Sequence, residues 1–214
     1  REDRLVFDFQ NTLAEQMGYQ TTAQKRASEQ LMQGFYRSAK AIIIENEVLL
    51  KLMHARVTPL SEPPTVIDQD FVLSQGLLSA QKPDLFQRKP EAILRCFQLL
   101  QQHPAIAGFS APLVRALQAA QPLIDKSFRQ QSLNKALFLQ ILQAKEGVHR
   151  SLRRMNRYGI LGRYIPVFGR VIAQMQHDLF HVYTVDEHTM NVLRNLRRFA
   201  KPELRHEFPL CSQL

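Results

Sequence analysis

Apolar residues recur at helical spacing at the start of the chain. Leu5, Phe9, Leu13 and Met17 follow one another at steps of four residues, which places them on one side of a helix. Gly18 comes directly after them, and glycine often ends helices because it readily adopts the left-handed backbone that closes the last turn. The pattern predicts a first helix that ends near residue 17.

A second, much longer helix follows. Thr21 or Thr22 can cap its start, and it runs to about Val57 before Pro59 stops it. Beyond Phe35 its apolar residues spread over more than one face. Because a helix that is apolar on several sides must bury more than one of them, we expect this helix to pack on two sides.

Between residues 60 and 89 the helical pattern gives way to β-type sequence. Two stretches rich in branched and apolar side chains, residues 66–72 and 77–79, flank the turn sequence Ser74-Gln75-Gly76. We predict one short β-hairpin at about residues 66–79. Helical periodicity resumes afterwards, so the predicted fold class is all-α, a multi-helix bundle with at most this one hairpin.

Helix signals then continue up to a change in composition. Ser110 and Ser132 can each cap a helix. Gly147 closes the last of these helices, and the sequence that follows is richer in arginine. We therefore place a domain boundary here, between a helical domain at residues 1–146 and the start of a second domain at residues 147–214.

The second domain opens with a helix that carries arginine on one side. Four arginines follow the spacing i, i+3, i+4 and i+7: Arg150, Arg153, Arg154 and Arg157. Guanidinium groups bind phosphates and carboxylates through paired hydrogen bonds. A solvated face and a contact with another domain or an acidic protein both explain the stripe. RNA binding is the least favoured explanation, because no aromatic side chain interleaves the stripe for base stacking.

Histidines and a carboxylate gather in the last fifth of the chain. His177 and His181 have the spacing that places two ligands on one helix face, with Asp178 between them, and such groups bind catalytic divalent metals. The zincin motif requires Glu directly after its first His, so structural or hydrogen-bonding roles compete for these residues. His188 lies on a helix that Thr184 and Glu187 can cap, and it shares a face with apolar residues: Val192, Leu196 and Phe199. We expect this face to be an inner one, where His188 is either a core residue or a metal ligand.

Composition adds a partner and excludes some classes of protein. The chain is 45% hydrophobic and 22% charged, as in an ordinary globular protein. A net charge of +9 indicates an acidic partner: nucleic acid, an anionic membrane surface, a nucleotide or an acidic domain. The chain begins in helix-forming sequence without Met and stops in an apolar-rich stretch, so we expect it to be part of a longer protein.

Cysteine usage and hydropathy bear on location. Two cysteines, Cys96 and Cys211, are too few for the disulfide framework of a small secreted domain. The most apolar stretch, residues 41–50, is interrupted by Glu45 and Glu47, and it therefore predicts no membrane span. With no signal-peptide pattern at the start, we expect a cytoplasmic location and no membrane partner.

Two long blocks of sequence resemble a known family. Both resemble the bacterial PII uridylyltransferase/uridylyl-removing (GlnD) family, and residues 1–10 resemble it as well. The two blocks are Met155-Asn-Arg-Tyr-Gly-Ile-Leu-Gly-Arg-Tyr-Ile-Pro166 and Gln174-Met-Gln-His-Asp-Leu-Phe-His-Val-Tyr-Thr-Val-Asp-Glu-His-Thr189. The resemblance implies a nucleotidyltransferase domain that moves UMP from UTP to a PII signalling protein in nitrogen regulation. It also implies an HD-type phosphohydrolase domain that removes the UMP, and ACT domains that sense glutamine.

The resemblance assigns a role to one histidine. The first metal ligand of the HD motif lies in a Glu-His-Thr sequence, which matches Glu187-His188-Thr189 here. The motif's later His-Asp pair has no match after His188, and His177-Asp178 precedes it. The transferase motif needs Gly-Ser before an Asp-x-Asp pair, and no Gly-Ser precedes Asp68-Gln69-Asp70, which we interpret as two exposed hairpin carboxylates.

The sequence therefore predicts a central segment of a bifunctional enzyme. The resemblance implies Mg²⁺ or Mn²⁺ for the parent enzyme, with PII, UTP and glutamine as partners. In this picture residues 1–146 follow the transferase domain and residues 147–214 begin a truncated HD domain. We expect the chain alone to be inactive and to hold no metal stably. The alternatives are a non-catalytic helical protein-interaction module and a basic nucleic-acid-binding helical domain.

Overall fold

The computed structural model describes residues 5–58, 63–175 and 183–213. The chain divides into two compact units: unit 1 comprises residues 1–40 and 170–214, and unit 2 comprises residues 41–169. The boundary predicted after residue 146 falls inside unit 2. Helix α8 (Val148–Arg157) contacts α4 (Ala92–Gln102) and α7 (Ser132–Gln143), so the arginine-rich helix packs with the helices that precede it.

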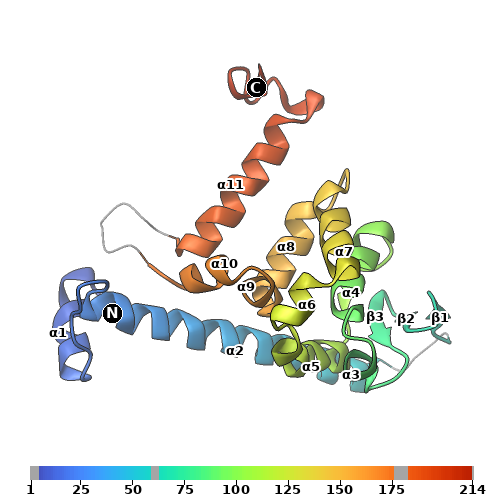
Figure 1. Ribbon diagram of the computed structural model, residues 1–214, viewed down its shortest axis with the longest axis horizontal. Helices are drawn as coiled ribbons and strands as arrows, with labels where there is room; N and C mark the ends of the chain where they lie inside the picture. Colours follow the sequence, from blue (N-terminus) through green and yellow to red (C-terminus); the bar gives the residue numbers. More distant parts are fainter. Residues whose placement is uncertain (1–4, 59–62, 176–182, 214) are drawn as a thin grey trace. The chain divides into compact units, whose positions relative to one another are not determined.

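Helices dominate the structure, as the periodicity predicted (Figure 1). The long helix α2 is Ala27–Val57, and it begins later than expected, although the Thr21 hydroxyl accepts a hydrogen bond from the Ala27 amide. Helix α2 crosses from unit 1 to unit 2 at residue 41. The remaining helices of unit 2 are α3 (Leu85–Arg88), α5 (Ala111–Ala120), the 3-10 helix Gln121–Leu123, α6 (Lys126–Gln130), α9 (Ile160–Tyr164) and α10 (Pro166–Val171), the last of which ends in unit 1.

The prediction of at most one hairpin is wrong, because the strands form a four-stranded mixed sheet. The predicted hairpin is present: β2 (Phe71–Ser74) pairs antiparallel with β3 (Leu77–Ala80). Gln75 and Gly76 both have positive φ, 49° and 73°, as a two-residue type I′ turn requires. Two further strands extend the sheet: β1 (Thr65–Val66) antiparallel to β2, and β4 (Gly108–Phe109) parallel to β3.

The two aspartates near the hairpin are not the exposed pair that the sequence indicated. Asp68 Oδ1 accepts hydrogen bonds from the amides of Asp70 and Phe71 at 2.8 and 2.9 Å, and its other oxygen meets Arg95 at 2.9 Å. Asp70 is buried and binds Lys89 at 2.7 Å. Both carboxylates therefore fix the turn before β2 and its contact with α4.

Aromatic side chains fill the core of unit 2. Phe97 and Phe109 are fully buried and meet edge-to-face, with ring centroids 5.2 Å apart. Tyr158 extends this cluster at 5.8 Å from Phe109. Gly159 follows with φ +77°, which confirms the predicted end of α8 at the Tyr158-Gly159 step. The cluster joins α4, β4 and α8, and it brings the ends of these elements together.

Unit 1 has a smaller core built around the start of α2. The short 3-10 helix Phe7–Phe9 leads into α1 (Gln10–Gln16), and Leu13, Ala14 and Tyr19 pack near Ala27 and Leu31. Leu5, Phe9 and Met17, which the spacing placed on one side of a single helix with Leu13, are exposed. Leu5 precedes the 3-10 helix, Phe9 ends it and Met17 follows α1, so the four positions do not lie in one continuous α-helix.

The C-terminal part of unit 1 contains α11 (Val185–Phe199) and the 3-10 helices Pro202–Leu204 and Cys211–Gln213. Along the described parts of the chain, no helix combines the length and apolar content that crossing a bilayer requires.

Candidate functional site

The start of α11 is fixed by a buried carboxylate. Thr184 occupies the N-cap position predicted for it, although its side chain makes no capping hydrogen bond. Asp186, two residues on, is fully buried and forms an ion pair with Lys40 of α2. Its Oδ1 also accepts the Ala173 amide at 2.9 Å. Three stretches of unit 1 therefore meet at one carboxylate.

His188 lies on the side of α11 that carries Val192 and Leu196, but this side is not an inner face in the described residues. His188 is exposed, and Val192 and Leu196 are 43% and 55% exposed. Only the end of the face is covered within the described part of unit 1, where Phe199 packs edge-to-face on Phe208 at 5.0 Å. The apolar stripe predicted from the spacing exists, and its part at His188, Val192 and Leu196 is exposed among the described residues.

Three weaker metal candidates were predicted beside His188. His177, Asp178 and His181 lie outside the described residues. Within residues 5–58, 63–175 and 183–213, no three His, Cys, Asp or Glu side chains come together in a way that could hold a metal ion. The described residues thus bring His188 close to a helix start and place no complete ligand set around it.

The arginine stripe on α8 is used largely inside unit 2. Arg150 donates to the carbonyl of Leu100, in the last turn of α4, at 3.0 Å. Arg154 donates to the carbonyl of Ala107, next to β4, at 2.6 Å, and burial lowers its pKa. Arg157 lies 3.6 Å from the Glu47 carboxylate. The stripe therefore helps to hold α8 against α4, β4 and α2, while Arg150, Arg153 and Arg157 remain exposed.

Glu47 is the centre of a polar network that sequence reasoning missed. It accepts hydrogen bonds from Lys51 and from the Tyr158 hydroxyl, the latter at 2.8 Å. Burial raises the pKa of Glu47, but the hydrogen bonds and charges of its partners outweigh burial, and the net pKa lies below its usual 4.5. Burial and the Glu47 charge also raise the pKa of Tyr158 above its usual value. Tyr158 therefore acts as a neutral donor to an ionised carboxylate.

Removing one donor from this network should weaken the fold measurably. Tyr158→Phe deletes the hydroxyl and should cost about 1.5–3 kcal/mol, as for hydrogen bonds to charged groups, measured by urea unfolding at pH 7. Because folding lowers the pKa of Glu47, the unfolded chain is protonated first as the pH falls. The stabilisation by ionised Glu47 is full above pH 4.5 and is lost as the pH falls through the lower folded pKa.

Two further variants test the carboxylate itself. Glu47→Gln should flatten the loss of stability below pH 4.5. Glu45→Gln is the matched control, since Glu45 is exposed and lies 3.3 Å from exposed Arg115. Equal effects of the two glutamine variants would contradict a specific role for Glu47.

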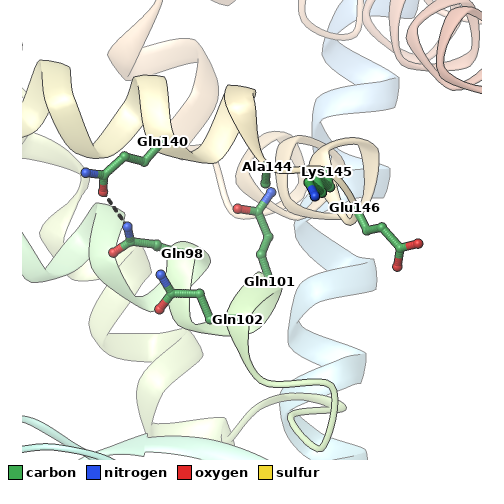
Figure 2. Close-up of a pocket in the computed structure, with 7 residues that line it drawn as sticks. All are labelled: Gln98, Gln101, Gln102, Gln140, Ala144, Lys145 and Glu146. Atoms are coloured by element: carbon green, nitrogen blue, oxygen red, sulfur yellow. Dashed lines mark hydrogen bonds between the residues drawn. The ribbon is translucent and has the colours of Figure 1, made fainter. Parts of the chain in front are cut away.

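A pocket lies between the ends of α4 and α7. It is lined by Gln98, Gln101, Gln102, Gln140, Ala144, Lys145 and Glu146. Figure 2 shows the amides of Gln98 and Gln140 joined by a hydrogen bond across the pocket, and Gln101 donates to the carbonyl of Ile141 at 3.1 Å. These amides link the two helices, so we interpret the pocket as a polar seam of the fold.

The whole chain is similar to known proteins. The family model described as "Uridylyltransferase GlnD third domain" matches residues 71–164, and the model described as "GlnD PII-uridylyltransferase" matches residues 1–50. Proteins named bifunctional uridylyltransferase/uridylyl-removing enzyme align with all of the chain: that of Thiobacillus denitrificans is 52% identical, that of Nitrosospira multiformis 51% and that of Nitrosococcus oceani 47%. The chain spans about a quarter of their lengths, 25%, 24% and 24% respectively. No solved structure matches the chain.

Proposed function

Because the chain belongs to the GlnD uridylyltransferase family, we propose that it is the helical segment between two active sites of a longer enzyme. This enzyme transfers uridylyl groups from UTP to a PII signalling protein and removes them again. The observation that supports the proposal is the alignment of all 214 residues with relatives named for both activities. A resemblance limited to one block would have left the rest of the chain unexplained.

Within this function, unit 1 supplies one metal-binding side chain. His188 matches the first ligand of the HD-type hydrolase motif, and its imidazole is exposed on the apolar side of α11. One imidazole does not fix a divalent ion, so the described residues do not form a metal site, and Mg²⁺ or Mn²⁺ would need ligands from other regions. The contribution of this chain is positional: Asp186, Lys40 and Ala173 hold the first turn of α11 in place.

Unit 2 supplies a rigid support. Its buried aromatic cluster and the Glu47 network tie α2 to α8. We propose a cytoplasmic location for both reactions, with glutamine acting on a region outside this chain.

Activity measurements on two proteins test the proposal. The first is the chain alone, and the second is the Thiobacillus denitrificans relative with this chain in place of its 52% identical segment. With PII, UTP and Mg²⁺ or Mn²⁺, the second protein should both add and remove uridylyl groups, and the chain alone should do neither. Turnover by the chain alone above an enzyme-free blank, or loss of both activities in a folded hybrid, would contradict the proposal.

A further inference from the structure

Helix α2 carries a second apolar stripe that unit 2 leaves uncovered. On one side, Ile44 and Val48 are buried in unit 2. At about 100° of rotation per residue, Ile42, Leu49 and Met53 point to the opposite side. The exposed stripe consists of Ile42 (68% exposed), Ile43 (55%), Leu49 (55%), Leu50 (57%), Met53 (54%) and Val57 (82%).

The stripe is larger than ordinary surface hydrophobicity. Single exposed apolar residues are common, but a monomer rarely exposes a contiguous apolar patch of more than a few hundred Å² unless something binds there. Six large apolar side chains follow one another over about four helical turns. The internal contacts of unit 2 do not require them, because Ile44, Val48 and the Glu47 network already attach α2 to it. The stripe therefore has the properties of an interface.

The family comparison indicates what covers it. Residues 42–50 fall within the match to the PII-uridylyltransferase model, residues 1–50, whereas the third-domain match begins at residue 71. Ile42, Ile43, Leu49 and Leu50 therefore lie in the first match, and Met53 and Val57 lie in the interval that neither model matches. The relatives are about four times as long as this chain, which covers 24–25% of them, so most of each relative is available to pack on this helix.

We propose that this stripe on α2 is the docking surface for another domain of the same polypeptide in full-length family proteins. That domain presents an apolar face to Ile42, Leu49 and Met53. It also places a carboxylate near exposed Arg56, which borders the stripe at its C-terminal end. The docking surface depends on family membership and on the exposed residues, not on the two proposed reactions.

Thiol labelling measures the coverage directly. Leu49→Cys is introduced in a Cys211→Ser background; the remaining Cys96 is fully buried, and burial raises its pKa, so it reacts slowly. The rate of alkylation is compared between the chain alone and the Thiobacillus denitrificans hybrid. Leu133→Cys on α7 is the matched control, because Leu133 is also 55% exposed.

We expect the thiol introduced by Leu49→Cys to react at least about tenfold more slowly in the hybrid, since labelling of a covered site requires local opening. The thiol introduced by Leu133→Cys should react at similar rates in both proteins. Equal rates at Leu49, or an equal slowing at Leu133, overturn the proposal. So does a rate at Leu49 in the chain alone that falls with protein concentration, which would identify a second copy as the occupant.

The same hybrid separates this surface from the proposed function. A hybrid that protects the Leu49→Cys thiol but has neither activity keeps the docking surface and contradicts the function. A hybrid that has both activities but leaves the Leu49→Cys thiol fully reactive supports the function and contradicts the docking surface.

Discussion

Replacing His188 with alanine in the full-length hybrid is expected to abolish uridylyl removal and largely spare uridylyl transfer. We propose His188 as the first metal ligand of the hydrolase motif, and loss of a metal ligand would affect the site that uses that metal. The transferase motif has no counterpart near α11 in the sequence. The expected result is loss of uridylyl release from modified PII, with incorporation of UMP from UTP still close to the parent level.

His206→Ala is the matched control for this experiment. His206 is an exposed histidine in the same unit, beyond the end of α11, and its removal should change neither activity. Equal loss of both activities in His188→Ala would show that His188 is structural. Full retention of uridylyl removal would show that the motif was assigned to the wrong histidine.

The second large expected effect is a loss of stability when the ion pair between Lys40 and Asp186, in the first turn of α11, is broken. Lys40→Met should destabilise unit 1 by about 3–5 kcal/mol, because it leaves a charge buried without its counter-ion. The asymmetry of the pair decides which partner to change: the Asp186 side chain is fully buried, whereas the Lys40 side chain is 25% exposed. A lysine that loses its partner can turn towards water, but this carboxylate cannot. Methionine preserves the packing of the lysine stem.

Urea unfolding followed by circular dichroism measures this loss. Lys201→Met is the control, because Lys201 is 48% exposed and lies 4.0 Å from Glu203 at the surface, where ion pairs contribute about 0–1 kcal/mol. The double variant Lys40→Met/Asp186→Leu should lose less than the sum of its two single variants. A loss for Lys40→Met no larger than that of the control would contradict the buried pair.

Local signals predicted the helices and the hairpin because each signal acts within a few residues. Ser110 caps α5 through the Leu113 amide, as its place before an apolar run indicated. The Gln75-Gly76 turn was also visible in the sequence, since few residue pairs accept two positive φ values. Strands β1 and β4 were missed because two residues show no periodicity, and β4 reaches β3 only after α3 and α4 have crossed over.

The site was predicted less well, because its partners are distant in the chain and several are backbone atoms. The spacing of the arginines correctly placed them along α8. It could not show that the carbonyls of Leu100 and Ala107 accept from Arg150 and Arg154, since every residue has a carbonyl. Asp186 lies in the first turn of α11, and nothing local in the sequence pointed to Lys40, 146 residues away. The sequence therefore shows which helix carries the charged side chains, but it does not show which distant atoms those side chains contact.

The shortness of the sheet's edges affects how this chain associates with others. An exposed edge strand invites pairing with a strand of another molecule, which is a route to aggregation. Here the two outer strands, β1 and β4, have two residues each. The β4 carbonyl of Phe109 already accepts a hydrogen bond from the Lys51 ammonium at 2.7 Å. An incoming strand would meet a charged side chain and too few backbone groups to form a ladder, so the sheet resists growing into a fibre.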